Sequence, residues 1–428
     1  MHPDLSAQLR ITTADPVRWI VAGRLLDAKN RRVLKNAHLV YDRNQILHAG
    51  VEAPDAAMLN GKTTADLTLP EFTALPGLIE GHSHTFLEGA ELASEKRADY
   101  QKQDPETLFQ KARPRLHMLA RMGIISMRDG GDKDQVGLRL SRLTAGKDCP
   151  PFSAQVFSPG AGIYRQGRYG SFFGKPLEDY ADIDSCVQGR IAEGADHIKI
   201  VPTGIINFAK GQVVSKPQFS VEEIQRFRQS SHARNRHLMA HASGDVGVGH
   251  AIDGGVDTVE HGFFITDDQL AKMRDRNISW VPTFSPVQEQ VDHADIMGWT
   301  GETLDNLKTI LANHATSLRK ALALGVNVLV GSDSGSCGVG HGSGLFYEME
   351  LLENAGMPAL DILCQATHGN NLALTNRQPY GSLEKGFKPR FIVTKHNPLE
   401  TVRNLQGDRW VVFDGAAESS ATVSLENL

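Results

Sequence analysis

Cysteine is scarce in this chain, with four residues in 428. None of them forms a CxxC or CxxH pattern, which argues against a structural zinc ribbon and against a disulfide framework. A chain without such pairs is expected in a reducing compartment. The four residues are Cys149, Cys186, Cys337 and Cys364.

Long apolar runs and blocks of basic residues are also missing. No run of about 18 apolar residues could span a bilayer, and the first residues lack the basic and apolar regions of a secretory signal. The formal net charge is −5, and no block of lysine and arginine could follow a phosphate backbone. We therefore expect a cytoplasmic protein that binds a small-molecule substrate, and neither nucleic acid nor a membrane.

The two ends of the chain differ in pattern from its middle. Short strand-like segments separated by polar turns fill the first 50 residues, without helical periodicity, and return at 390–394 and 409–413. We expect residues 1–74 together with 380–428 to form one small β-sandwich domain.

Residues 75–379 alternate strand-like and helical segments. Apolar residues recur about every 3.6 positions over 105–122, and a second helix over 220–236 opens with the capping box Ser220-Val221-Glu222-Glu223. Such alternation indicates parallel βα units, so the predicted fold class is α/β, a (β/α)₈ TIM barrel. Its strands are expected to end at His82 and to span 124–128, 153–158, 197–201, 237–242, 257–261, 279–284 and 327–333.

The most informative motif is Gly81-His82-Ser83-His84, directly after the apolar run 75–80. Residues two apart in a strand point to the same face, so His82 and His84 can reach one divalent ion through neutral ring nitrogens. Further ligand-type residues follow, each at the end of its own strand-like segment. Because a (β/α)₈ barrel assembles its site at the carboxyl ends of its strands, they are expected to converge. They are Lys199, His241, His261 and Asp333.

These residues lie within longer motifs, which are Leu75-Pro76-Gly77-Leu78-Ile79, Gly194-Ala195-Asp196-His197-Ile198-Lys199-Ile200, Ala240-His241-Ala242, Val259-Glu260-His261-Gly262 and Gly331-Ser332-Asp333. In this order they resemble the metal-dependent amidohydrolase superfamily, in its binuclear branch with a carboxylated lysine. The resemblance spans nearly the whole chain and is strongest to prolidase-like and imidazolonepropionase-like hydrolases. It implies two metals with the ligands His82, His84 and Asp333 for the more buried ion, His241 and His261 for the more exposed ion, and Lys199 as a carbamate bridge.

The resemblance also implies an activity. A desolvated lysine amine can add carbon dioxide and become an anionic oxygen ligand, which an ammonium group cannot be. Two metals would supply a bridging hydroxide, and Asp333 would be the catalytic proton shuttle. The implied reaction is hydrolysis of an amide or peptide-type C–N bond in a small carboxylate-bearing substrate, such as a dipeptide or an N-acyl amino acid. Zinc is the first expectation for the metal, with manganese, cobalt and iron open, and a homo-oligomer is also open.

Substrate binding is expected in two glycine-rich loops. The loop 160–174 combines arginines with aromatic residues, and an arginine fork suits a carboxylate. The loop 337–344 follows the Asp333 strand and brings a histidine toward the mouth of the barrel. For the first loop, a solvated surface segment is the open alternative. The candidate substrate-binding residues are Tyr164, Arg165, Arg168, Tyr169 and His341.

Two other functions stay open from the sequence. One is a mononuclear deaminase or a cyclic amide or imidate hydrolase on the same fold, against which Lys199 and the lack of an acidic residue just after His241 argue. The other is a catalytically silent metal-binding scaffold, which the full ligand set disfavours. The chain also departs from the family pattern, with Glu80 in place of aspartate and a changed sequence at 366–374. We expect Glu80 to leave metal binding intact.

Overall fold

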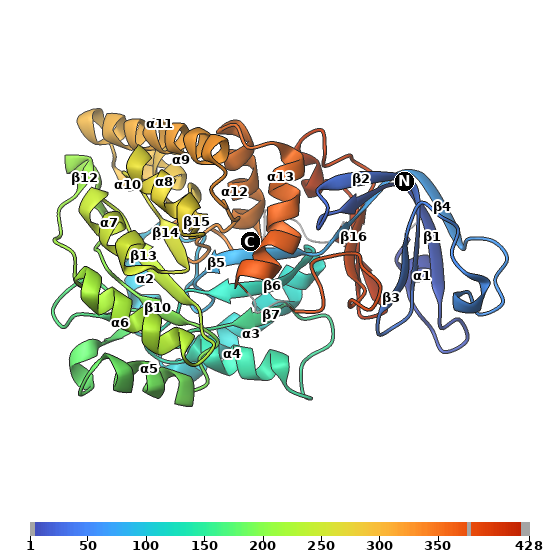
Figure 1. The fold of residues 1–428 in the computed structure, drawn as a ribbon, viewed down its shortest axis with the longest axis horizontal. Helices are drawn as coiled ribbons and strands as arrows, with labels where there is room; N and C mark the ends of the chain where they lie inside the picture. Colours follow the sequence, from blue (N-terminus) through green and yellow to red (C-terminus); the bar gives the residue numbers. More distant parts are fainter. Residues whose placement is uncertain (1–4, 375–377, 421–428) are drawn as a thin grey trace.

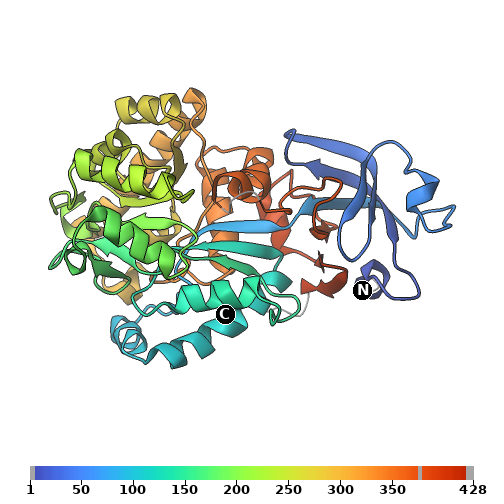
Figure 2. The same cartoon turned by 60° about the horizontal axis from the view of Figure 1, so that its bottom comes forward.

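The computed structural model describes residues 5–374 and 378–420, and two units lie side by side in it (Figure 1). One unit is a sheet to which both ends of the chain contribute. The other is an α/β body in which helices surround parallel strands (Figure 2). Residues 1–4 and 421–428 of the expected terminal domain lie outside the described residues, as do residues 375–377 just before its boundary at 380.

The terminal unit is one mixed sheet with the strand order β18-β17-β16-β4-β1-β2-β3. Strand β4 joins the two ends of the chain, because it pairs with β1 in parallel and with β16 in antiparallel fashion. Its strands are β1 (Arg18–Asp27), β2 (Arg32–Tyr41), β3 (Ile46–Gly50), β4 (Leu67–Pro76), β16 (Arg390–Thr394), β17 (Arg409–Phe413) and β18 (Ala416–Ser419), accompanied by α1 (Ser6–Leu9), η1 (Ala56–Met58) and η5 (Val402–Gln406).

The terminal strands form one sheet, where the sequence predicts a sandwich, and this sheet contains a bulge. The register between β1 and β4 shifts between Ala22 and Arg24. A Cβ atom on the intervening Gly23 would lie 1.8 Å from the carbonyl oxygen of Pro70, so only glycine fits there. A bulge bends and twists the strands that carry it, and this one lies beside β4, the strand that pairs with both β1 and β16.

The second unit contains two parallel sheets, β5-β6-β7 and β15-β14-β13-β10-β8-β9. Every residue of β5, β6 and β13 is buried, as expected for parallel strands that helices cover on the outside. The strands are β5 (Leu78–Ser83), β6 (Ile124–Asp129), β7 (Gln155–Phe157), β8 (Gly162–Tyr164), β9 (Gly174–Pro176), β10 (Ile198–Ile200), β13 (Leu238–Ala242), β14 (Thr258–His261) and β15 (Ser279–Val281).

The expected strand at 327–333 contributes isolated hydrogen bonds and no regular strand of its own within the described residues. The amide of Leu329 donates to the carbonyl oxygen of Trp280 at 2.8 Å, and the amide of Gly81 donates to that of Val330 at 3.0 Å. The segment therefore lies between β15 and β5. At its end, the amide of Asp333 donates to the carbonyl oxygen of a residue in β5 at 2.7 Å.

The side chain of Asn370 reinforces this junction. Its amide nitrogen donates to the carbonyl oxygens of Ile79 and Val330, both at 2.7 Å, and its oxygen accepts from the amide of Val330 at 3.3 Å. Asn370 is fully buried and follows the π-helix η4 (Gln365–Gly369). The segment 366–374, which departs from the family pattern, thus fastens β5 to the segment before Asp333.

The helices begin and end largely where the sequence predicts. The expected helix at 105–122 is α3, capped by Asp104, and the expected helix at 220–236 is α6, with the Ser220–Glu223 capping box in place. None of the helices in the described ranges combines the length and apolar character needed to traverse a bilayer. The helices are α2 (Ser94–Gln101), α3 (Pro105–Arg121), α4 (Val136–Ala145), α5 (Ile183–Ala192), α6 (Val221–His232), α7 (Asp245–Gly254), α8 (Asp267–Asp275), α9 (Ser285–Asp292), α10 (Ala294–Met297), α11 (Gly301–Leu324), α12 (Ser343–Asn354), α13 (Ala359–Cys364) and α14 (Asn370–Leu374), with η2 (Leu177–Asp179), η3 (Phe208–Lys210) and the hairpin β11 (Ile206–Asn207) and β12 (Gln212–Val213).

Replacing Asn370 tests this junction. Asn370→Ala should lower the free energy of unfolding by about 2–4 kcal/mol, because it leaves buried backbone groups of two strands without partners. Chemical denaturation monitored by circular dichroism measures the change. The matched control is the exposed Asn44→Ala, for which we expect a change within about 0.5 kcal/mol. Equal stabilities for both variants would show that the junction does not depend on Asn370.

Candidate metal centre

The predicted ligands converge at one end of the parallel strands. Each is buried, with at most 9% of its surface exposed. The ring centroids of His82 and His84 lie 5.6 Å apart, those of His82 and His261 5.1 Å, and those of His241 and His261 4.5 Å. The histidines therefore form one cluster across β5, β13 and β14. The buried candidates are His82, His84, Lys199, His241, His261 and Asp333.

One group within this cluster has the spacing of a metal site. The ligand atoms of His82, His84 and Asp333 all lie within 4.8 Å of one another. Oδ1 of Asp333 is 3.5 Å from Nε2 of His82 and 3.6 Å from Nε2 of His84. A divalent ion bound by two imidazoles and a carboxylate is a common arrangement in catalytic sites.

Unsatisfied atoms show that this donor set fits metal ions. Nε2 of His82, Nε2 of His241 and Oδ1 of Asp333 are buried and have no hydrogen-bond partner in the described part of the chain. Leaving buried polar atoms unpaired is costly, so such atoms call for an explanation. A cation that accepts their lone pairs provides one.

In two further histidines of the cluster, hydrogen bonds to the protein orient the ring. Nδ1 of His84 donates to the carbonyl oxygen of Gly131 at 3.1 Å, and Nδ1 of His261 lies 2.7 Å from Oγ1 of Thr283. The Thr283 hydroxyl itself donates to a backbone carbonyl at 2.8 Å, so it accepts from His261. With Nδ1 protonated, Nε2 of each ring carries the lone pair that a metal needs.

Burial sets the charges in the cluster. Desolvation lowers the pKa of His84 and of His241 to about 3, and the pKa values of the other two histidines fall well below their usual range. Burial also lowers the pKa of Lys199 to about 8, although nearby carboxylates oppose the shift. For Asp333, burial raises the pKa to about 7. The imidazoles are therefore neutral, and the lysine reaches its uncharged form far more readily than an exposed lysine does.

Glu260 holds His82 in place but is not among the residues that the sequence predicts for this site. Its carboxylate accepts from Nδ1 of His82 at 2.8 Å and from Nη2 of Arg128 at 2.7 Å. Arg128 also donates from Nη1 to Thr258 at 3.0 Å and from Nε to the carbonyl oxygen of Gly81 at 2.8 Å. All of these side chains are buried. The one sequence signal is a second ionisable residue directly before His261 in a short buried strand.

Glu80 links the two chain segments that carry the first ligand group. Its carboxylate accepts from the amide of His82 at 3.0 Å, from the amide of Ser332 at 2.9 Å and from the Ser332 hydroxyl at 2.6 Å. Burial raises the pKa of Glu80 to about 7. Glu80 contacts the ligands only through the backbone, where it fixes the distance between β5 and Asp333.

Backbone strain marks the same region. His261, Thr283 and Asp333 have φ values of 68°, 49° and 59°, in the left-handed region that residues other than glycine rarely adopt. Such conformations cost free energy and tend to occur at functional sites, where the surrounding structure maintains them.

A cavity of about 380 Å³ opens onto the cluster. His84, His241, His261 and Asp333 line its floor. Its walls are largely apolar and come from the loops that follow several strands. The ring of Phe173 lies 5.5 Å from that of His84, which places an aromatic wall directly against a candidate ligand. Its other apolar lining residues are Leu87, Tyr169, Phe172, Ile205, Ile206, Phe208, Phe263, Pro286 and Val287.

Of the predicted substrate-binding residues, only Tyr169 lines this cavity. Its ring lies 5.6 Å from that of His241. Tyr164 and His341 are buried elsewhere, and Nε2 of His341 is 2.8 Å from the carbonyl oxygen of Leu87.

The two arginines of the loop do not reach the cavity, because other groups hold them. The Arg165 guanidinium pairs with Glu178 at 3.1 Å and with Glu223 of α6, and Arg168 donates to the backbone carbonyl of Lys216. Neither arginine therefore lies where it could bind a substrate carboxylate in this cavity, as the sequence had predicted for them.

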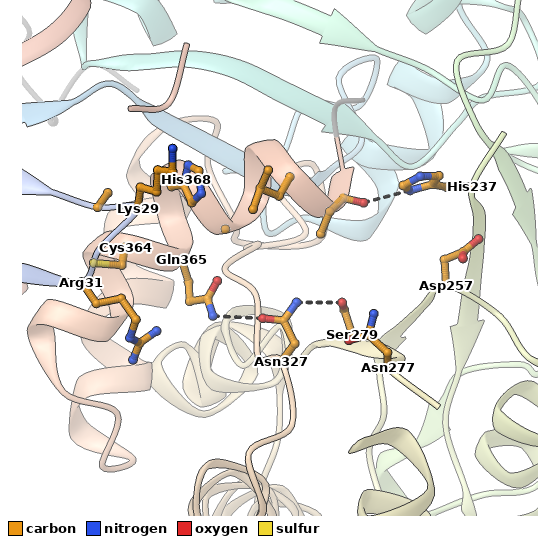
Figure 3. A pocket seen from close by; sticks show the side chains of 14 residues that line it. Lys29, Arg31, His237, Asp257, Asn277, Ser279, Asn327, Cys364, Gln365 and His368 are labelled. Atoms are coloured by element: carbon orange, nitrogen blue, oxygen red, sulfur yellow. Dashed lines mark hydrogen bonds between the residues drawn. The ribbon is translucent and has the colours of Figure 1, made fainter. Parts of the chain in front are cut away.

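A second cavity of about 420 Å³ lies at the opposite ends of the strands and contains none of the predicted ligands (Figure 3). His237 and Asp257, which precede β13 and β14, line it together with side chains that bond to one another. Gln365 donates to Oδ1 of Asn327 at 3.0 Å, and Asn327 donates to Oγ of Ser279 at 2.9 Å (Figure 3). The candidate site is therefore the cavity above the histidine cluster.

Replacing Glu260 tests its role in orienting His82. Glu260→Gln should weaken zinc binding by about 10- to 100-fold, the usual effect of losing the carboxylate that orients a ligating histidine. Titration of metal-free protein against a chromophoric chelator measures the affinity, with circular dichroism to confirm folding. The matched control is Glu348→Gln, which changes a buried carboxylate that caps α9 and contacts no candidate ligand. Equal affinities in both variants would contradict the orienting role.

Comparison with known proteins places this geometry in a family. Residues 73–413 match the model of the amidohydrolase family. Ochratoxinase from Aspergillus niger is 25% identical over 227 residues, which are 53% of this chain. The chain spans only 46% of the length of that curated relative.

Solved structures share the fold at low sequence identity. A Xaa-Pro dipeptidase crystallised with methionine in its active site has a TM-score of 0.78 and 24% identity, over 94% of this chain and 99% of the other. The ochratoxinase of A. niger has a TM-score of 0.77 and 21% identity, over 94% and 95%. The family match covers most of the chain, including every residue of the histidine cluster, and the chain therefore belongs to the amidohydrolase family of hydrolases.

Proposed function

We propose that this amidohydrolase cleaves an amide or peptide-type C–N bond in a small carboxylate-bearing substrate, such as a dipeptide or an N-acyl amino acid. The observation that carries the proposal is the set of buried, partner-free ligand atoms on His82, His241 and Asp333 beneath a single cavity. The fold shared with a Xaa-Pro dipeptidase is consistent with such a substrate.

We further propose that the parallel strands form a (β/α)₈ barrel over residues 75–379, with 1–74 and 380–428 as the second domain. Hydrogen bonds across both breaks between the two parallel sheets support this arrangement. On one side, the segment 327–333 bonds to β15 and β5. On the other, the amide of Asp196 donates to the carbonyl oxygen of Ser158 at 2.8 Å, which links the end of β7 to the segment before β10.

The proposed cofactors are two divalent metal ions, zinc first and manganese, cobalt or iron as alternatives. His82, His84 and Asp333 would hold one ion, His241 and His261 the other, and N6-carboxylated Lys199 would bridge them. The burial of Lys199 and its lowered pKa support carboxylation, because only the neutral amine adds carbon dioxide. When bound, the ions lower the pKa of water and polarise a carbonyl group.

Asp333 is proposed to carry the proton. Its Oδ2 accepts from the Ser336 hydroxyl at 2.9 Å, whereas Oδ1 faces the ligand nitrogens and has no hydrogen-bond partner within the described residues. A carboxyl group with a pKa of about 7 can take up and release a proton near neutral pH. With Oδ1 as the metal ligand, the other carboxylate oxygen would take the proton from the attacking water and pass it to the leaving amine.

The aromatic wall is proposed to hold the apolar part of the substrate. Tyr169, Phe172 and Phe173 pack edge to face on one another, with centroids 4.5–5.9 Å apart. Tyr169 is the one substrate-binding residue from the sequence that we retain. Because the aromatic wall also contacts the rings of His84 and His241, a bound apolar group would lie against both proposed metal positions.

A mononuclear deaminase or cyclic amide hydrolase is the second candidate. Among the described residues, only His82, His84 and Asp333 come within 4.8 Å as a complete group, which one ion would satisfy. A single bound metal and an unmodified Lys199 would favour this function over the binuclear one.

Lys199→Ala tests the binuclear centre. Wild-type protein purified without chelator should contain two equivalents of metal, and its native mass should include one added carbon dioxide. The variant should lose the bridge and at least one equivalent, because Lys199 is the ligand proposed to join the two positions. Short-chain carboxylic acids added to the variant should restore part of the activity. Full metal content in the variant, measured by elemental analysis, would rule out the bridge.

Asp333→Asn tests the proton carrier and the reaction together. Wild-type enzyme should release free amine from a panel of dipeptides and N-acetyl amino acids. The variant should fold but lose turnover by about 10²- to 10⁴-fold at saturating metal, because an amide cannot accept the proton. Ser336→Ala, which removes only the hydrogen bond to Oδ2, should have a smaller effect. A kcat near the wild-type value in Asp333→Asn would show that another group carries the proton.

A further inference from the structure

One cation lines the cavity and has no carboxylate partner. Arg97 of α2 is the only lysine or arginine among the described residues that line the cavity above the histidine cluster. No acidic side chain lies within ion-pair distance of its guanidinium in the described ranges, whereas the guanidinium groups of Arg128 and Arg165 are both paired with glutamates. Arg97 therefore leaves a positive charge at the cavity that the protein does not neutralise.

Backbone carbonyl groups fix the position of this charge. Nη1 of Arg97 donates to the carbonyl oxygens of Gly89 at 3.2 Å and Glu91 at 3.4 Å, and Nη2 donates to that of Gly335 at 2.9 Å. These bonds orient the planar group but contribute no net charge. They also leave the Nε–H and one Nη2–H of the guanidinium free, since arginine carries five N–H donors.

Arg97 is held between the loops that carry metal ligands. Gly89 lies in the loop after His84, Gly335 lies two residues beyond Asp333, and the amide of Gly338 donates to the Gly89 carbonyl at 3.0 Å. Gln101, one helical turn after Arg97, lines the same part of the cavity. The aromatic wall, in contrast, comes from the loop after β8. The cavity thus has a cationic side and an apolar side, built by different loops, with the ligand cluster below.

We propose that Arg97 binds the free carboxylate of the substrate, while the aromatic wall holds its apolar group. The assignment deepens the proposed function and rests on it. Of the charged groups that line the cavity, only a guanidinium of this kind offers two parallel N–H donors to a carboxylate. Arg97 takes the role that the sequence suggested for Arg165, Arg168 or Tyr169.

A pair of substrates that differ only in the carboxylate tests the assignment. N-acetyl-leucine and N-acetyl-leucinol share the same amide bond and the same apolar side chain, but only the first carries a negative charge. In metal-loaded Arg97→Gln, kcat/KM for the acid should fall roughly 10- to 100-fold, mostly through KM, as expected for loss of a charged hydrogen bond. For the alcohol, kcat/KM should stay within about twofold of wild type, and Arg97→Lys should recover part of the loss.

A control variant and a binding measurement distinguish the outcomes. Arg168→Gln removes an exposed cation that does not line the cavity, and it should not discriminate between the two compounds. Equal losses for acid and alcohol in Arg97→Gln would overturn the assignment and leave Arg97 as a support for its loops. Calorimetric binding of the acid needs no turnover. The wild type could bind the acid without cleaving it. If Arg97→Gln then no longer binds the acid, the assignment stands while the proposed hydrolysis fails. A wild type that binds acid and alcohol equally would overturn the assignment.

Discussion

The buried carboxylate of Glu260 is the contact on which the candidate centre depends. It accepts from His82 on β5 and from Arg128 on β6, and it belongs to β14, so one carboxylate ties three strands together at the depth of the ligands. A buried carboxylate is stable only when its charge is balanced and its lone pairs are used, and Arg128 and His82 meet both needs. Because the hydrogen bond from Nδ1 fixes the tautomer of His82, the same carboxylate stabilises the strands and orients the candidate ligand.

Desolvation has opposite effects on neighbouring groups of this site, and each effect suits the proposed chemistry. It keeps the histidines neutral, brings Lys199 toward its amine form and raises the pKa of Asp333 toward neutrality. None of these shifts needs a dedicated partner, because all follow from placing polar side chains at the buried ends of parallel strands. The left-handed backbone conformations of His261 and Asp333 also cost free energy, which the surrounding structure must compensate.

The sequence predicts the parts of this structure that depend on local pattern. Strands ending in His82, His241 and His261 are visible because each ligand follows its own apolar segment, and the helices at α3 and α6 are visible through their caps. Contacts between distant segments are not visible in this way. Asn370 and Glu260 acquire their roles only from partners far away in the chain. The sequence predicts Arg165 at the substrate because a guanidinium suits a carboxylate. Its pairing with Glu178 and Glu223 is not predictable in this way, because it depends on how the loop packs against α6.

The bracing of that loop also bears on how such an enzyme could diversify. The ion pairs of Arg165 and the bond from Gln218 to the backbone of Tyr169 anchor the loop from outside the cavity, at groups that touch no ligand of the cluster. Substitutions at these anchors would reshape the aromatic wall while the candidate metal centre at the ends of the strands stays unchanged. In this architecture, substitutions can therefore change the choice of substrate independently of the capacity for hydrolysis.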